Sequence, residues 1–249
     1  MRARNSLYWL RNNSIRVVSR TLSILTRRII PAESKDEWQH ATVSFSQLGE
    51  DLAIQKVLTK IHVRSPAWYV DIGAFDPIQY SNTLLLHKRG WCGVNVDADP
   101  TAIERFKSAR PLDVNIHAAV SDAEEDVGFF MYRSPATHKI GTRSDDLSIL
   151  GERPQRVVTL RTRTLASILR EHLPSGVEFG LLNVDCEGHD LRVLRSNDWS
   201  SFRPKILVVE DFDWSPNSEM MTYCQSLGYQ PRALLDIARL FVDCSSSTR

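Results

Sequence analysis

The chain has 249 residues, of which 42% are hydrophobic and 24% are charged, as is typical of a globular protein. This length allows one α/β domain of roughly 200 residues plus an extension. The formal net charge of +1 argues against a surface tuned to nucleic acid, so we expect no nucleic-acid partner.

The four cysteines, at positions 92, 186, 224 and 244, form no CxxC pair and have no spacing typical of a metal site. We therefore expect a reduced, cytoplasmic compartment. No uninterrupted apolar stretch is long enough to span a bilayer.

The first 30 residues carry seven arginines and no acidic residue, and their apolar residues recur at steps of three to five. This pattern predicts a basic amphipathic helix. Three interpretations stay open: a helix docked on the domain or on a second subunit, a peripheral helix on an anionic membrane, and an organellar presequence. Residues 31–40 are polar and acidic, so we predict a helix and linker over 1–40 and a folded domain over 41–249.

Alternating strand and helix patterns fill the folded part of the chain. Strands are predicted at 68–72, 93–96, 114–120, 127–132, 157–163, 179–185, 205–209, 229–235 and 239–243. Helices are predicted from Ser46 or Gly49 to Ile61, at 82–88, 101–109 and 165–172, from Leu191 onwards, and at 218–227. This order predicts an α/β fold with a mostly parallel, Rossmann-like sheet and helices on both faces. The last two strands are joined by a tight turn, which requires one antiparallel strand near the C-terminus.

The predicted strand at 68–72 ends at Gly73, and Ser81 is expected to cap the helix at 82–88. A strand, a glycine turn and a helix form the first half of a nucleotide-binding unit, in which ligands lie beyond the carboxyl ends of the strands. Asp97 lies 24 residues after Gly73, near the interval at which such folds place an acid that binds a ribose. A solvated acid in a turn is the alternative interpretation.

The predicted strand at 114–120 ends in Ser121 and Asp122. In a nucleotide-binding fold this strand end lies beside the base, so either side chain could bind an adenine amine. A plain turn is the alternative.

Several motifs occur in order along the chain: SQLGED at 46–51, VDIGA at 70–74, SNT at 81–83, GW at 90–91 with Gly93, Asp97 followed by Pro100, AVS at 119–121 and NVDCEGHD at 183–190. Together, over residues 45–243, they resemble the FkbM family of S-adenosylmethionine-dependent methyltransferases. The resemblance implies a class I methyltransferase fold and O-methylation of a sugar or another hydroxylated metabolite.

The resemblance also implies roles for individual residues. Asp71 and Gly73 would line the methionine end of S-adenosylmethionine, and Asp97 would hold its ribose. The whole expected cofactor set is Asp71, Gly73, Ala74, Asn82, Asp97, Ala98, Ser121 and Asp122. Two positions depart from the common family pattern: the second strand ends in DADP where many relatives have Glu-Pro, and Asp190 stands where Glu is common. The ribose contact would therefore be made by a shorter acid.

Transfer of a methyl group to a hydroxyl requires alignment of the reactants and removal of the hydroxyl proton. Asp185, Glu187 and His189 cluster just past the strand at 179–185, where acceptor-side groups are common in this class. We expect His189 to be the general base, because its unperturbed pKa suits that role. A capping or packing role for His189 is the alternative.

A magnesium site is the other hypothesis for the same region. Asp185 ends one strand, and Glu210 and Asp211 end the next, so three carboxylates could converge on one Mg²⁺ ion. Plain turn formers are the alternative interpretation of these acids.

We expect an S-adenosylmethionine-dependent O-methyltransferase that acts on a sugar, a glycan precursor or a related small molecule. Specificity for the acceptor is assigned to the polar loop at 133–156, in whose first part His138 is the only candidate base. Two alternatives stay open: a nicotinamide-dependent oxidoreductase, and a non-catalytic methyltransferase-like module tethered by its N-terminal helix. The single glycine after Asp71 and the terminal strand pair argue against the oxidoreductase.

Overall fold

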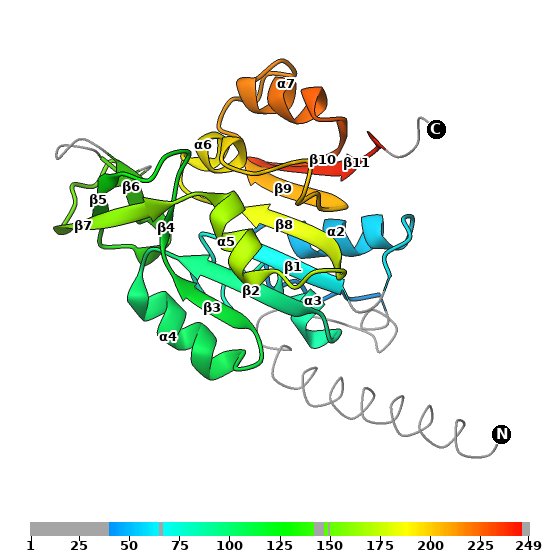
Figure 1. Ribbon diagram of the computed structural model, residues 1–249, viewed down its shortest axis with the longest axis horizontal. Helices are drawn as coiled ribbons and strands as arrows, with labels where there is room; N and C mark the ends of the chain where they lie inside the picture. Colours follow the sequence, from blue (N-terminus) through cyan, green and yellow to red (C-terminus); the bar gives the residue numbers. More distant parts are fainter. Residues whose placement is uncertain (1–39, 65–66, 142–146, 149, 246–249) are drawn as a thin grey trace. The chain divides into compact units, whose positions relative to one another are not determined.

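The computed structural model describes residues 40–64, 67–141, 147–148 and 150–245 (Figure 1). The predicted N-terminal helix and nearly all of the predicted linker therefore lie outside the described residues. The chain divides into one unit at 1–43 and a second, compact unit at 44–249. Within the described part, no helix combines the length and the apolar character needed to cross a bilayer.

The second unit is built on a seven-stranded sheet with the order β10-β11-β9-β8-β1-β2-β3. Its strands are β1 (Ala67–Ile72), β2 (Cys92–Asp97), β3 (Val114–His117), β8 (Glu178–Val184), β9 (Ile206–Glu210), β10 (Tyr229–Leu235) and β11 (Ala238–Asp243). Strands β9, β8, β1, β2 and β3 pair in parallel. All seven residues of β8 are buried, as expected for a strand in the middle of a sheet covered on both faces. The predicted fold class is therefore confirmed.

The C-terminal strands run antiparallel, as their short connection requires. Strand β11 pairs antiparallel with both β10 and β9. The turn between β10 and β11 is at Asp236 and Ile237, and Asp236 has a φ of 54°. The predicted antiparallel edge is confirmed.

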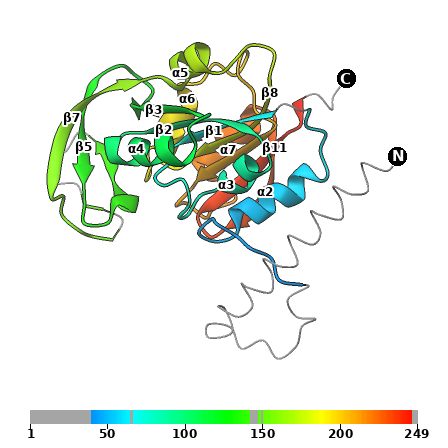
Figure 2. The same ribbon diagram turned by 90° about the horizontal axis from the view of Figure 1, so that it is seen from below.

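Helices cover both faces of this sheet because successive residues of each strand point to opposite sides. On one face Val70 and Ile72 pack with α5 (Leu165–His172), α6 (Asp190–Arg195) and α7 (Glu219–Ser226). On the other face Tyr69 packs with α2 (Glu50–Leu58) and α3 (Leu84–Lys88). Figure 2 shows α5 and α2 on opposite sides of the strands. Helix α4 (Pro100–Ala109) packs against β2 and β3.

The helix boundaries follow local signals in the sequence. The hydroxyl of Ser218 accepts the Met221 amide at the start of α7, and Gly228, with a φ of 85°, follows its end. The prediction for α3 was too long, because the helix begins at Leu84 rather than at residue 82. The Ser81 hydroxyl still accepts the Leu84 amide, so it satisfies one helical donor from outside the helix.

A second, four-stranded sheet has the order β4-β7-β5-β6 and was not expected. Its strands are β4 (Ala119–Val120), β5 (Asp126–Met131), β6 (Lys139–Gly141) and β7 (Arg156–Arg163). The strand predicted at 114–120 is split at Ala118: β3 stays on β2, whereas β4 pairs with β7. The alternating pattern of β7 identifies a strand but not its partner, because pairing depends on residues far away in the sequence.

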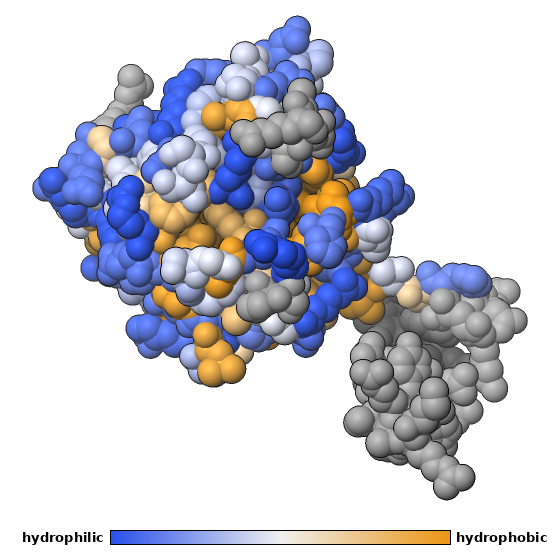
Figure 3. Space-filling view, turned by 45° about the vertical axis from the view of Figure 1, so that its right-hand side comes forward, coloured by the Kyte–Doolittle hydropathy of each residue, from blue (hydrophilic) through white to orange (hydrophobic). Residues whose placement is uncertain are grey.

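The loop predicted at 133–156 carries more structure than expected. It contains a 3₁₀ turn at Pro135–Thr137 and the short strand β6, which pairs with β5. In Figure 1, β5, β6 and β7 gather to one side of the large sheet. The face seen in Figure 3 is largely hydrophilic, with apolar residues in a hollow near its middle.

Candidate active site

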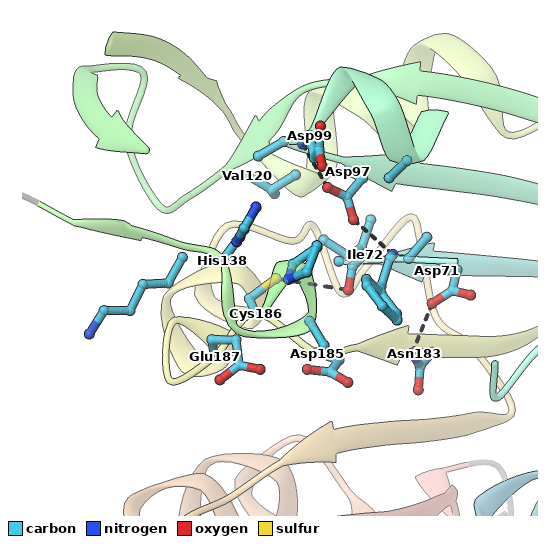
Figure 4. A pocket seen from close by; sticks show the side chains of 18 of the residues that line it. Asp71, Ile72, Asp97, Asp99, Val120, His138, Asn183, Asp185, Cys186 and Glu187 are labelled. Carbon is cyan, nitrogen blue, oxygen red and sulfur yellow. Dashed lines mark hydrogen bonds between the residues drawn. The ribbon is translucent and has the colours of Figure 1, made fainter. Parts of the chain in front are cut away.

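A pocket with about 1030 Å³ of open space lies at the carboxyl ends of β1, β2, β8 and β9 (Figure 4). Residues after these strand ends form its floor, as expected for a parallel α/β sheet. The second sheet supplies the opposite wall through Phe129 of β5, the 3₁₀ turn, and His138, Lys139 and Ile140.

Asp71 is a buried carboxylate that joins three elements at the edge of this pocket. Its exposed fraction is only 2%, and it accepts hydrogen bonds from the Thr83 hydroxyl at 2.7 Å and the Asn183 amide at 2.8 Å. The Asn183 carbonyl in turn accepts from the Asn82 amide at 2.9 Å. Burial raises the pKa of Asp71, and the two side-chain hydrogen bonds oppose that shift. Asp71 and Asn82, two of the residues expected to bind the cofactor, both line the pocket.

Gly73 allows the ends of β1 and β8 to approach closely. Its φ is 75°, and a Cβ atom at this position would lie 1.7 Å from the backbone oxygen of Asp185. Its own amide and that of Ala74 both donate to the Val96 carbonyl of β2. Only glycine meets the steric and the conformational requirement at once. Gly73 and Ala74, which also belong to the expected cofactor set, line the pocket.

The loop between β1 and α3 contains two non-glycine residues with left-handed backbone conformations, Phe75 with a φ of 53° and Tyr80 with a φ of 56°. Their rings stack with a centroid distance of 6.3 Å. The Arg105 guanidinium donates to the Phe75 carbonyl at 2.9 Å. Such conformations persist only where the surroundings hold them, and they concentrate at functional sites. Both aromatic residues line the pocket.

Asp97 lies at the end of β2 and is partly exposed in the pocket. One carboxylate oxygen accepts the Phe75 amide at 2.8 Å, and the other accepts the Asp99 amide at 2.7 Å. Each oxygen keeps a second lone pair, so the carboxylate can still accept from two vicinal hydroxyls. Burial raises its pKa to about 6. Ala98, the next residue of the expected cofactor set, also lines the pocket.

Ser121, Asp122 and His189 form a polar cluster that is not part of the pocket lining. The Ser121 hydroxyl lies 2.9 Å from Nε2 of His189 and 3.1 Å from the Asp122 carboxylate. Asp122 is paired with Arg192 at 2.6 Å. Burial lowers the pKa of His189 to about 4, so its ring is neutral at physiological pH. These three predicted site residues therefore lie outside the pocket lining, and His189 stands directly before α6.

Three other carboxylates converge at the pocket. Asp185 and Glu187 follow β8, and Glu210 ends β9; one oxygen from each lies within 4.8 Å of the other two. Figure 4 shows Asp185 and Glu187 side by side below Asp97. Glu187 is held with a φ of 53°, a strained conformation for a residue with a side chain. All three line the pocket.

Burial and mutual repulsion raise the proton affinity of this carboxylate cluster. Burial raises the pKa of Glu187 to about 7, and the negative charge of Asp185 adds to that shift. Burial raises the pKa of Glu210 well above its ordinary value, again with help from Asp185. One carboxylate oxygen of Glu210 is buried without a hydrogen-bond partner. The cluster can therefore bind a proton near neutral pH, or a hard cation in its place.

Asp211 does not belong to this cluster, which corrects the predicted ligand set of Asp185, Glu210 and Asp211. Its carboxylate accepts from Arg239 at 2.6 Å and from the Ser218 hydroxyl at 2.5 Å, and both charged side chains are buried. Neighbouring residues of an extended chain point in opposite directions, so Glu210 and Asp211 cannot both face the pocket. Glu187 takes the place of Asp211.

His138, which the sequence offered as a candidate base, lines the pocket, and its contacts determine which ring nitrogen carries the proton. Its Nδ1 accepts the Tyr132 backbone amide at 3.2 Å. Burial lowers its pKa, so the ring is neutral and carries its proton on Nε2. His138 is therefore a hydrogen-bond donor.

Arg110 is a supporting residue that the sequence patterns did not reveal. Only 1% of it is exposed, and it donates to the Thr83 and Ser81 hydroxyls at 2.9 Å and to the Pro77 carbonyl at 2.6 Å. These hydrogen bonds hold the β1–α3 loop in place. In the sequence it is an ordinary basic residue after a helix, and its partners lie 27 to 33 residues away.

Similarity to known proteins agrees with this geometry. The family model described as "Methyltransferase FkbM domain" matches residues 71–231, from the acid at the end of β1 into β10. No curated protein and no solved structure shows significant similarity to the chain. The matched segment covers more than half of the 249 residues and contains the pocket floor described above. The chain therefore belongs to the FkbM methyltransferase family.

Proposed function

We propose that this methyltransferase uses S-adenosylmethionine to methylate a hydroxyl group of a sugar or a related small molecule in the cytoplasm. The observation that carries the proposal is the cluster of Asp185, Glu187 and Glu210 in the pocket at the carboxyl ends of the parallel strands. A hydroxyl group is a poor nucleophile at neutral pH, so its methylation requires a proton acceptor.

The residues of the pocket fit the cofactor. Asp97 retains two free acceptor positions for the ribose hydroxyls, and the apolar Ala98 and Val120 lie beside it. The glycine at position 73 leaves the floor of the pocket open where a Cβ atom would collide with the backbone. S-adenosylmethionine, when bound, supplies a methyl group on a positively charged sulfur.

The chain's own contribution is to remove the proton of the acceptor hydroxyl. We assign this role to Glu187, whose pKa of about 7 suits a general base at neutral pH. Asp185 supports it electrostatically, because its negative charge raises the pKa of Glu187. Lys139, which also lines the pocket, opposes that shift.

The alternative for the same three carboxylates is a Mg²⁺ site, in which Glu187 would be a metal ligand and not the general base. Hard oxygen ligands from neighbouring strand ends suit this cation. Isothermal titration of the full chain with MgCl₂ should give a binding signal that is lost in Glu187→Gln and kept in Asp122→Asn, whose side chain lies outside the pocket lining. Equal binding to both variants would remove Mg²⁺ from the proposal.

Calorimetry of the full chain with S-adenosylmethionine, with its demethylated product and with NAD tests the cofactor. We expect binding of the first two ligands and none of NAD. Binding of NAD alone would instead support an oxidoreductase on this sheet. Binding of S-adenosylmethionine without turnover of any hydroxylated acceptor would support a non-catalytic module.

A further inference from the structure

A chain of hydrogen bonds leads from the buried side chain of Arg110 to side chains that line the pocket. The Arg110 guanidinium donates to the Thr83 hydroxyl at 2.9 Å, and this hydroxyl donates to Asp71 at 2.7 Å. Asp71 also accepts from the Asn183 amide at 2.8 Å, and the Asn183 carbonyl accepts from the Asn82 amide at 2.9 Å. The last three residues line the pocket, whereas Arg110 and Thr83 do not. Two side chains behind the pocket are therefore connected to side chains that can touch a ligand.

The guanidinium sets the direction of this chain, because it donates hydrogen bonds and never accepts them. The Ser81 hydroxyl accepts from Arg110 and from the Leu84 amide. Its own proton is therefore left for the Thr83 oxygen, which lies 3.3 Å away. Both lone pairs of the Thr83 oxygen are then occupied, so the Thr83 proton points to Asp71.

The charge of Arg110 favours the ionised form of Asp71. Burial raises the pKa of Asp71, and its two side-chain hydrogen bonds and the charge of Arg110 lower it. Three other carboxylates, those of Asp97, Asp113 and Asp185, repel its negative charge. The buried guanidinium offsets this repulsion.

The ionised form of Asp71 determines the orientation of the two amides in the pocket. A carboxylate only accepts hydrogen bonds, so Asn183 turns its NH₂ group toward Asp71 and its carbonyl toward Asn82. Asn82 uses its nitrogen in this contact, so its carbonyl oxygen can accept from a ligand. A protonated Asp71 would allow the reverse orientation, in which Asn183 donates to the Asn82 oxygen and occupies it.

The sheet order indicates which part of the cofactor reaches Asn82 and Asn183. Asp97, proposed above to bind the ribose, ends β2, and Asn183 lies on β8; these two strands flank β1 on opposite sides. The apolar Val120 lies on the Asp97 side of the pocket, where β3 and β4 follow, and suits the base. The amino-acid end of the cofactor would then extend over β1 toward β8. A carboxamide oxygen beside a buried carboxylate suits the ammonium group at that end.

We propose that Arg110 and Thr83 are positioning residues that act through Asp71 to orient the Asn82 carboxamide, so that its oxygen binds the ammonium group of the cofactor. The inference rests on the proposed function, because it requires S-adenosylmethionine or its demethylated product in the pocket. Neither positioning residue touches the ligand.

The test compares S-adenosylhomocysteine with its deamino analogue, in which a hydrogen atom replaces the ammonium group. Calorimetry with the full chain measures both affinities in the wild type, in Thr83→Val, which removes the hydroxyl and keeps the shape, and in Thr83→Ser, which keeps the hydroxyl. Thr162→Val is the matched control: Thr162 is also buried, and its hydroxyl donates to the Ala123 carbonyl at 2.6 Å, outside the pocket lining. Urea denaturation of every variant measures stability.

We expect the wild type to bind S-adenosylhomocysteine at least about tenfold more tightly than the deamino analogue, a difference of about 1.4 kcal/mol. Thr83→Val should lose most of this preference and keep its affinity for the deamino analogue. Thr83→Ser should restore the preference, and Thr162→Val should keep it even where its stability falls.

The charge of Arg110 is tested by the pH dependence of the same preference. Without the guanidinium Asp71 binds a proton more readily, so Arg110→Gln should lose the preference at a higher pH than the wild type. Arg110→Lys, which keeps the charge, should follow the wild type more closely. If neither Arg110 variant folds, the two Thr83 variants decide the inference.

Three results would overturn the inference: equal binding of the two ligands by the wild type, an unchanged preference in Thr83→Val, or an equal loss of affinity for both ligands in that variant. The last result would show that Thr83 only supports the fold. Failure of the wild type to bind either ligand would instead contradict the proposed function.

Discussion

Glu187 and Glu210 belong to different strand ends, yet their carboxylate oxygens lie within 4.8 Å of each other and of Asp185. At this separation, ionised carboxylates repel one another substantially. The pKa of each of the three groups is raised. A fold tolerates such a cluster at a cost in stability, which is characteristic of sites where proton affinity serves a function. The cluster can therefore be probed by pH.

The first prediction concerns the general base. If ionised Glu187 accepts the hydroxyl proton, kcat should rise as the pH increases through about 7 and then level off. Glu187→Gln should abolish this pH dependence and lower kcat by roughly 10²-fold to 10⁴-fold, the usual contribution of a general base. The measurement is a pH–rate profile with S-adenosylmethionine and a methyl glycoside as the acceptor.

His189→Gln is the control for this prediction, because the imidazole contacts Ser121 and does not line the pocket. Its kcat profile should keep the same midpoint. If the rise of kcat with pH is lost in His189→Gln and kept in Glu187→Gln, the imidazole accepts the proton instead of Glu187.

The second prediction concerns stability without ligands. Burial raises the pKa of Glu187 from its ordinary 4.5 to about 7, so the folded state holds this proton more tightly than the unfolded state. Between these two values the folded state binds more protons, and the free energy of unfolding therefore decreases as the pH rises. Glu187→Gln should flatten this decrease, as measured by urea denaturation at pH 4.5, 6 and 7.5.

His189 changes the free energy of unfolding with pH in the opposite direction. The contributions of the two groups can therefore be distinguished. The pKa of His189 is lowered from 6.5 to about 4, so the unfolded state binds more protons in this interval. Stability from this group is lost as the pH falls from 6.5 toward 4. A decrease in stability with rising pH that persists unchanged in Glu187→Gln would show that the raised pKa belongs to another group.

The third prediction concerns the ribose. Asp97→Asn should weaken binding of S-adenosylhomocysteine by about 1–3 kcal/mol, because one charged acceptor is replaced by an amide. Asp122→Asn is the matched control: Asp122 follows strand β4 of the second sheet, but it pairs with Arg192 and does not line the pocket. Calorimetry should find a normal affinity in the control. Equal losses in the two variants would mean that the cofactor extends to Ser121 and Asp122, as the sequence suggested.

The predicted site residues that line the pocket share one property. Asp71, Gly73, Asp97 and Asp185 each stand directly after or at the end of an apolar strand, and the carboxyl ends of parallel strands meet at one edge of a sheet. Local patterns are therefore enough to bring them together. The fold class could be predicted for the same reason.

The incorrect parts depend on geometry beyond the strand ends. The direction of a side chain in a turn is set by backbone angles such as the left-handed conformation of Glu187, which hydrophobic patterns do not encode. The sequence therefore did not distinguish Glu187 from His189, or Glu210 from Asp211. Arg110 and the β4–β7 pairing depend on partners far away in the sequence, so neither could be predicted from local patterns.

The last prediction concerns the close contact at the pocket floor. Gly73→Ala should destabilise the protein strongly, because the new Cβ atom would lie 1.7 Å from the Asp185 backbone oxygen in addition to the cost of a φ of 75°. Gly90→Ala is the matched control, since Gly90 has a φ of 85° and no atom within 4 Å of an added Cβ. The control should lose only about 1 kcal/mol, the usual cost of a left-handed conformation for a residue with a side chain. Urea denaturation should therefore find a several-fold larger loss for position 73, with loss of S-adenosylhomocysteine binding in that variant alone. Equal losses at the two positions would mean that β1 and β8 can separate at Gly73 without disturbing the site.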